Sequence, residues 1–176
     1  MGHTIKKLWN ILTSILVGLV VLLAVALVGV RLFGLSPYVV LSGSMEPTYH
    51  VGSLIYVKDV DYKELKAGDP ITFMLSEDTV ATHRIVEVLV DEKDPETIRY
   101  FTKGDANDST DGSSVHYKNV IGMPVFTIPY LGYLSNYIQS PPGLYVAIAV
   151  GAILIMLVFL PDLFESEEKE DGKIKE

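Results

Sequence analysis

The longest uncharged run of the chain constrains its fold more than any other feature. Residues 11–30, ILTSILVGLVVLLAVALVGV, carry no charge. A helix rises about 1.5 Å per residue, so this run can span roughly 30 Å, the hydrocarbon thickness of a bilayer. The alternative, a cleaved signal peptide, has an apolar region of only about 7–15 residues and a small-residue cleavage site, which does not follow here. We therefore expect a retained transmembrane helix over residues 11–30.

A second uncharged run ends just before a proline and an acidic tail. Residues 144–160, LYVAIAVGAILIMLVFL, are near the short end of what a spanning helix needs. Neither run has the polar stripe of a surface helix. We expect a second transmembrane helix here. A buried core helix and a helix lying in the membrane interface are the alternatives.

Lysine and arginine near the ends of these runs predict the orientation, because cytoplasmic flanks carry an excess of them. Lys6 and Lys7 precede the first run and three lysines follow the second, whereas Arg31 alone lies close to a membrane end between the runs. Both termini are therefore predicted to be cytoplasmic. The resulting division is a cytoplasmic N-terminus (1–10), a transmembrane helix (11–30), an extracytoplasmic domain (31–143), a second transmembrane helix (144–160) and an acidic cytoplasmic tail (161–176), whose composition predicts disorder.

Composition excludes several kinds of chemistry. The net charge of −8 argues against a nucleic-acid surface, which needs clustered lysine and arginine. The absence of cysteine excludes disulfides, thiol nucleophiles and the commoner zinc sites. We expect no cofactor, no metal and no nucleic-acid partner.

The segment between the two runs has the pattern of strands. Short apolar stretches rich in Val, Ile, Thr and Tyr alternate with turn residues from 36 to 140. The predicted strands are Pro37–Leu41, Ser53–Val57, Pro70–Leu75, Val80–Val90, Thr97–Thr102 and Val120–Thr127. No ten-residue helical pattern competes, although Asp61–Lys66 fits one helical turn. The predicted fold is mainly β: one compact antiparallel β domain with an N-terminal and a C-terminal transmembrane helix.

A stiff turn displays two serines directly after the first predicted strand. Its sequence is Ser42-Gly43-Ser44-Met45-Glu46-Pro47. Gly43 permits a close backbone approach, and Pro47 restricts Glu46 to an extended conformation. Alone, such a segment is most often only a turn. Its functional interpretation is a nucleophile at Ser44.

His83 is the one histidine in the interior of a predicted strand of this domain. His50 lies in the loop after Pro47, and His116 falls in a polar loop. A lone strand histidine is more often structural than catalytic. A serine hydroxyl, however, needs a neighbouring base, and an imidazole, which ordinarily titrates near pH 6.5, suits that task close to neutral pH.

An acidic loop follows the fifth predicted strand and supplies three carboxylates. Its sequence is Lys103-Gly104-Asp105-Ala106-Asn107-Asp108-Ser109-Thr110-Asp111-Gly112. The spacing lacks the terminal Glu and the flanking helices of a calcium-binding EF-hand. A surface turn rich in Asp and Asn is the ordinary interpretation. The functional one is that an aspartate orients the histidine and stabilises its cationic form.

Together, these segments resemble the signal peptidase I family, in its archaeal and endoplasmic-reticulum branch. The resemblance rests on SGSMEP after an N-terminal anchor, on Thr-His-Arg about forty residues later, and on TKGDANDSTD about twenty residues further on. Residues 122–124 and 128–133 are similar to the closing part of the family. His83, where the bacterial branch has a lysine base, and Glu46 after Ser44-Met45 indicate the branch.

The resemblance implies a role for each candidate residue. Ser44 is implied to be the nucleophile and His83 the general base. By position, Asp111 matches the acid of the relay and Asp105 the structural or assisting acid. The Ser42 hydroxyl and the Ser44 amide match the oxyanion hole.

We expect the substrate to bind as an added strand beside residues 38–41 and the strand that carries His83. The predicted substrate-binding residues are Tyr38, Val39, Val40, Leu41 and Thr82. Small substrate side chains one and three residues before the cut would face shallow pockets, because alternate residues of a strand face one side. Lys103 is expected in a loop and Asp108 in water, neither with a catalytic role.

The expected function is that of a membrane-bound serine endopeptidase that removes signal peptides after small residues. Its expected partners are the signal peptides of preproteins, the lipid bilayer and the protein-export machinery. Its expected location is the archaeal plasma membrane, with the endoplasmic reticulum as the alternative. Two other functions stay open: a processing protease with a Ser–Lys pair on the same scaffold, and a non-catalytic membrane-anchored assembly subunit.

Overall fold

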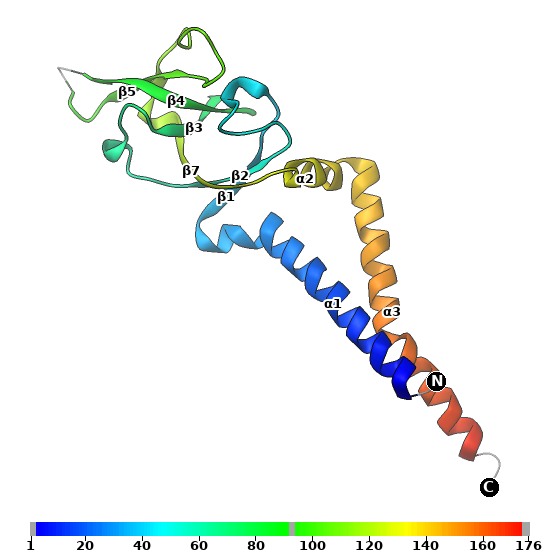
Figure 1. Cartoon of the computed structure of the whole chain (residues 1–176). Coiled ribbons are helices and arrows are strands. Elements are labelled where there is room, and N and C mark those ends of the chain that lie inside the picture. Colours follow the sequence, from blue (N-terminus) through cyan, green and yellow to red (C-terminus); the bar gives the residue numbers. More distant parts are fainter. Residues whose placement is uncertain (1–2, 92–93, 174–176) are drawn as a thin grey trace. The chain divides into compact units, whose positions relative to one another are not determined.

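The computed structural model describes residues 3–91 and 94–173. The chain divides into two compact units, which are described separately. Residues 28–136 form the first unit, called the β domain below, and residues 1–27 and 137–176 form the second. Figure 1 shows the strands of the β domain and the long helices near the two termini.

The β domain is built on one antiparallel sheet, as the sequence predicts. Its seven strands are joined in the order β1-β2-β7-β3-β4-β5-β6. They are β1 (Leu35–Val39), β2 (Leu54–Lys58), β3 (Pro70–Ser76), β4 (Thr79–Val90), β5 (Ile98–Lys103), β6 (Val115–His116) and β7 (Val120–Ile128). Strand β7 pairs with β2 through its second half and with β3 through its first, so it joins the two parts of the sheet.

The main hydrophobic core lies on one face of β3, β4 and β5. Its most buried members, Ile71, Phe73, Ile85 and Tyr100, are at most 2% exposed. His83 pairs directly opposite Ile71, and two residues further along β4 lies Ile85. Because opposite residues, and alternate residues of one strand, face the same side of a sheet, the His83 side chain lies on the core face.

The structure differs from the prediction at His116, at Lys103 and in one unpredicted helix. His116 lies in β6 rather than in a polar loop, and Lys103 is the last residue of β5 rather than a loop residue. Helix α2 (Leu131–Gln139) was not predicted. Gly132 weakens the helical signal, but it is needed because an added Cβ would lie 2.5 Å from the carbonyl oxygen of Ser53. The single helical turn expected near residue 62 is present as the 3-10 helix Tyr62–Glu64.

The second unit contains two helices that are long and apolar enough to cross a membrane. They are α1 (His3–Leu27) and α3 (Pro141–Lys173), whose apolar segments are residues 4–27 and 141–159. Within this unit the indole of Trp9 donates a hydrogen bond to the carbonyl oxygen of Leu157, at 3.1 Å. Helix α1 ends at Leu27, and a 3-10 helix (Gly29–Phe33) follows it, so residues 28–30 of the predicted span lie outside the observed helix. Helix α3 runs on to Lys173, whereas the sequence places a disordered tail after Pro161.

Candidate active site

The two serines of the stiff turn lie at a short 3-10 helix, Gly43–Met45. Ser42 precedes it in an extended conformation, and Glu46 ends it with φ −63° and ψ 145°, the extended shape that the following proline imposes. Met45 is only 2% exposed and anchors the turn in the protein interior. The turn therefore holds Ser44 on a fixed backbone immediately after β1.

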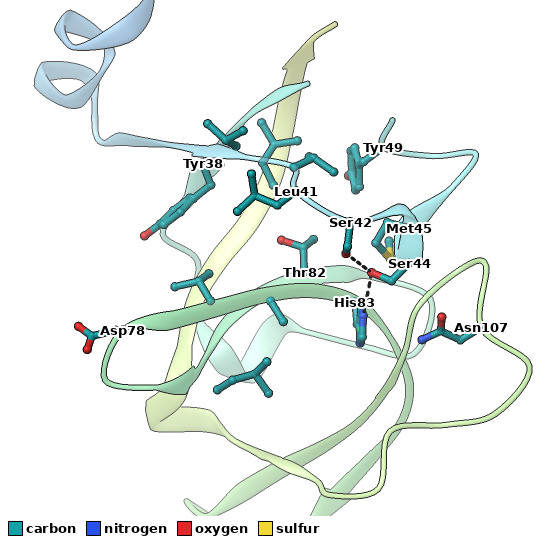
Figure 2. A pocket seen from close by; sticks show the side chains of 16 residues that line it. Tyr38, Leu41, Ser42, Ser44, Met45, Tyr49, Asp78, Thr82, His83 and Asn107 are labelled. Atoms are coloured by element: carbon teal, nitrogen blue, oxygen red, sulfur yellow. Dashed lines mark hydrogen bonds between the residues drawn. The ribbon is translucent and has the colours of Figure 1, made fainter. Parts of the chain in front are cut away.

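Ser44, His83 and Asp111 are brought into one hydrogen-bonded line. His83 Nε2 lies 3.2 Å from Ser44 Oγ, and His83 Nδ1 lies 2.7 Å from Asp111 Oδ2. The Ser42 hydroxyl lies 3.3 Å from that of Ser44, and Figure 2 shows Ser44 between Ser42 and His83. The side chains of His83 and Asp111 are 15% and 24% exposed. Three groups that are far apart in the sequence thus share one partly buried site.

Thr102 also binds the carboxylate of this line, a role that no feature of the sequence indicates. Its hydroxyl donates to Asp111 Oδ2 at 2.6 Å, the same oxygen that faces His83. Thr102 is completely buried, and its carbonyl accepts the backbone N–H of Asp111 at 2.8 Å. Thr102 therefore fixes both the backbone and the side chain of Asp111.

The second predicted acid, Asp105, faces an arginine. Arg84 Nε and Nη2 donate to the two carboxylate oxygens of Asp105 at 2.8 and 2.7 Å, and Arg84 Nη1 donates to the carbonyl oxygen of Gly68. Thr48 Oγ1 adds a hydrogen bond to Asp105 at 2.5 Å. The hydrogen bonds from Arg84 are the main reason that the pKa of Asp105 lies below its usual value, and Asp105 in turn raises the pKa of Arg84. Asp105 thus has a supporting position beside the line rather than a place in it.

The acidic loop is docked on the backbone of the nucleophile turn. The N–H of Ala106 donates to the carbonyl oxygen of Ser44 at 2.9 Å. Gly104 is buried here, and a Cβ added to it would lie 2.5 Å from that same oxygen. Only glycine allows this approach of the two backbones. This contact holds the loop that carries Asp111 against the turn that carries Ser44. The two residues are thus linked through the backbone as well as through His83.

A cavity of about 640 Å³ opens beside Ser44 (Figure 2). All five residues predicted to bind substrate line it: Tyr38, Val39, Val40, Leu41 and Thr82. The Thr82 hydroxyl is already hydrogen-bonded to that of Thr72, at 2.8 Å. The other lining groups are Ser42, Ser44, Met45, Tyr49, Ile55, Leu75, Asp78, Val80, Ala81, His83 and Asn107. Burial raises the pKa of the Tyr49 hydroxyl, the only lining tyrosine besides Tyr38.

Two strand edges border this cavity. Strand β1 is the terminal strand of the sheet and pairs only with β2. Strand β4 pairs with β5 only from Arg84 onward, so residues 79–83 pair with β3 alone. Within the described parts of the chain, no further strand covers these edges. An extended peptide could therefore add to the sheet at this place.

The acidic loop does not gather its carboxylates around one point. Asp105 faces Arg84, Asp111 faces His83, and Asp108 is exposed. Across residues 3–91 and 94–159, no three acidic or histidine side chains come together as a set that could hold a metal ion. The Lys103 amine donates a hydrogen bond to the carbonyl oxygen of Asp108, at 3.4 Å.

A hydroxyl, an imidazole and a carboxylate in this order form the geometry with which serine peptidases activate their nucleophile. In this chain they lie beside a cavity that is bordered by two open strand edges. The family model "Signal peptidase, peptidase S26" matches residues 12–130. The chain belongs to this signal peptidase family.

Individual relatives support the same assignment. Signal peptidase I W of Bacillus subtilis (strain 168) is 42% identical over 123 residues, which cover 65% of this chain and 63% of that protein. The signal peptidase complex catalytic subunit SEC11C of Rattus norvegicus is 32% identical over 128 residues, 68% of this chain and 66% of that protein. The chain thus matches just under two thirds of the length of each of these relatives.

Proposed function

We propose that the chain is a membrane-bound serine endopeptidase of the signal peptidase I type, which removes N-terminal signal peptides from preproteins after small residues. The observation that carries the proposal is the hydrogen-bonded line from Ser44 through His83 to Asp111. The names of the relatives indicate the substrate class.

In the proposed mechanism, Ser44 Oγ attacks the scissile carbonyl while His83 Nε2 accepts the hydroxyl proton. His83 then gives this proton to the leaving amine, and the acyl group on Ser44 is released by water. Asp111 holds the imidazole in the tautomer that carries hydrogen on Nδ1 and stabilises its cationic form. The Ser44 N–H and the Ser42 hydroxyl stabilise the developing oxyanion.

We infer that the substrate binds as a strand in the cavity between β1 and residues 79–83 of β4. Its main chain would pair with the open edges, which makes binding largely independent of side chains. About half of the residues that line the cavity are aliphatic, and we expect the substrate side chains that face them to be small. Alternate residues of a strand face one side, so the selection falls on the residues one and three before the cut.

We assign the chain to the branch with a histidine base because His83 faces Ser44 within hydrogen-bonding distance, whereas no lysine among the described residues does so. The proposed location is the archaeal plasma membrane, with the endoplasmic reticulum as the alternative. The higher identity to the Bacillus protein extends the candidates to a bacterial plasma membrane. In each case α1 and α3 would anchor the enzyme with residues 31–143 outside the cytoplasm, where membrane-bound preproteins reach a high effective concentration.

Preprotein cleavage in detergent tests the proposal. The wild type should trim a preprotein with an Ala-x-Ala site, and Ser44→Ala, His83→Ala and Asp111→Ala should leave it uncut. Ser42→Ala should slow cleavage roughly 100-fold without abolishing it, because one oxyanion donor is lost. Asp105→Ala should retain part of the activity, since it supports the loop through Arg84. Equal product from the wild type and Ser44→Ala would show that the chain is a non-catalytic subunit.

The pH dependence of cleavage separates a histidine base from a lysine base. With a histidine base, kcat/KM should fall only on the acidic side of neutrality, because a protonated imidazole cannot accept the hydroxyl proton of Ser44. A fall that already begins well above pH 8 would indicate a Ser–Lys protease and contradict the role of His83.

A further inference from the structure

Asn107 is a polar group of the cavity that has no part in the mechanism above. It lines the cavity together with Ser44 and His83 and is partly exposed. Among the described residues, none is hydrogen-bonded to its side-chain amide, although its backbone N–H donates to the carbonyl oxygen of Gly104 at 3.0 Å. An amide that is held beside the reacting groups but left unpaired can bind an incoming ligand.

Asn107 lies at the opposite end of the cavity from the proposed substrate strand. Figure 2 shows Tyr38 and Leu41 on one side of the Ser44–His83 pair and Asn107 on the other. A peptide whose residues before the cut lie along residues 38–41 must place its scissile carbonyl at Ser44. Its next residues then continue toward Asn107.

The backbone that carries Asn107 is fixed relative to the nucleophile. The preceding residue, Ala106, donates its N–H to the carbonyl oxygen of Ser44, and the turn from Gly104 to Asn107 is closed by its own hydrogen bond. The distance between the Asn107 backbone and Ser44 is therefore set by the fold rather than by a free loop. This is the property expected of a binding group that works next to the reacting bond.

We propose that the Asn107 amide binds the substrate main chain directly after the scissile bond, on the leaving-group side. A side-chain amide has both a donor and an acceptor, so it can pair with the N–H and C=O of one extended residue, whatever the side chain of that residue is. A protease that processes many preproteins needs this kind of contact, because the chains that follow the cut share only their backbone. The inference rests on the proposed peptidase function and adds a binding subsite to it.

Two substrates with identical residues before the cut test the proposal on the full chain. The first is a peptide that continues for five residues beyond the scissile bond; the second ends there in a methyl ester. Asn107→Ala and the isosteric Asn107→Leu should lower kcat/KM roughly tenfold on the peptide, because one or two hydrogen bonds are lost. Both variants should hydrolyse the ester within twofold of the wild-type rate, since it has no main chain for Asn107 to bind.

Asn136→Ala, at an exposed position outside the cavity, is the matched control and should act on both substrates like the wild type. An equal loss on peptide and ester would show that Asn107 only supports Ser44 and would overturn the proposal. An unchanged rate on both would overturn it as well. If the wild type cleaves neither substrate, the peptidase function itself fails, an outcome distinct from the other two.

Discussion

At the scale of single residues, the buried hydroxyl of Thr102 determines where the Asp111 carboxylate points. Thr102→Val removes this donor and preserves the shape of the side chain. Asp111 would then be held toward His83 by fewer hydrogen bonds, so we expect kcat to fall roughly threefold to tenfold with KM unchanged. Thr102→Ser keeps the hydroxyl and should restore most of the rate. Steady-state kinetics on a peptide substrate measure both constants.

Thr127 provides the control for this substitution. Its hydroxyl is also buried, but it has no hydrogen-bond partner among the described residues. Thr127→Val should therefore leave kcat unchanged and should not lower the free energy of unfolding. A loss of kcat in Thr127→Val as large as in Thr102→Val would contradict the assigned role of Thr102.

Gly104 allows the acidic loop to approach the nucleophile turn, and its replacement should separate them. In Gly104→Ala the new Cβ would lie 2.5 Å from the carbonyl oxygen of Ser44, so the backbone must shift. We expect a loss of about 1–3 kcal/mol of unfolding free energy and a lower kcat. Gly112→Ala, in the same loop, meets nothing within 4 Å and should change neither. Urea unfolding and peptide cleavage of both variants check this, and equal effects would contradict it.

The residues that the sequence indicated and those it did not differ in a physical way. Ser44, His83 and Asp111 have characteristic neighbours in the sequence, and the structure places them together, while their catalytic roles remain predictions. Thr102 and Asn107 could not be found in this way. A buried threonine in a strand is ordinary by composition, and an unpaired amide is visible only when its surroundings are known.

At the scale of elements, the Arg84–Asp105 pair connects β4 to the loop after β5, and Thr48 connects both to the nucleophile turn. Asp105→Asn should lower the free energy of unfolding at pH 7 by about 1–2 kcal/mol. The pKa of Asp105 is lowered in the folded protein, mainly by Arg84, relative to about 3.9 in an unfolded chain. The contribution of the ionised Asp105 to the free energy of unfolding is therefore complete above about pH 4. It is lost as the pH falls through the lower pKa that Asp105 has in the folded protein.

Urea unfolding of the wild type and Asp105→Asn between pH 3 and 7 measures this dependence. The difference between the two proteins should be constant from pH 7 to 5 and should shrink below pH 4. Asp108→Asn makes the same change at an exposed position of the loop and should match the wild type throughout. If the difference in free energy of unfolding between the wild type and Asp105→Asn grew toward low pH, it would contradict a stabilising interaction between Arg84 and the ionised Asp105.

The sheet could be predicted to within about two residues at most strand ends, because its long strands alternate or run apolar between clear turn residues. Strand β6 was missed, since two residues are too few to show a period of two. Helix α2 was missed because the glycine that its packing requires lowers its helical propensity. The order of the strands in the sheet could not be predicted, because β7 lies between β2 and β3 through contacts between residues that are distant in the sequence.

At the scale of the whole molecule, the absence of cysteine makes the membrane orientation directly measurable. A single cysteine introduced as Glu77→Cys, in the exposed turn between β3 and β4, should react with a membrane-impermeant maleimide in intact cells. A cysteine introduced as Lys7→Cys should react only after the membrane is opened, because the N-terminal flank is predicted to be cytoplasmic. The unmodified chain is the control and should not be labelled.

The reverse labelling pattern would place the β domain in the cytoplasm. Labelling of both positions in intact cells would show that α1 does not cross the membrane. Either result would contradict the two-helix orientation while leaving the geometry around Ser44 untouched.

The open edge of β1 has a consequence for turnover. Contacts made through the main chain before the cut are the same for an intact preprotein and for the fragment released from it. Such contacts therefore hold both equally well. Under the proposed function, the severed signal peptide should compete with new substrate for the site. Throughput in a membrane would then depend on how quickly that fragment is carried off or degraded.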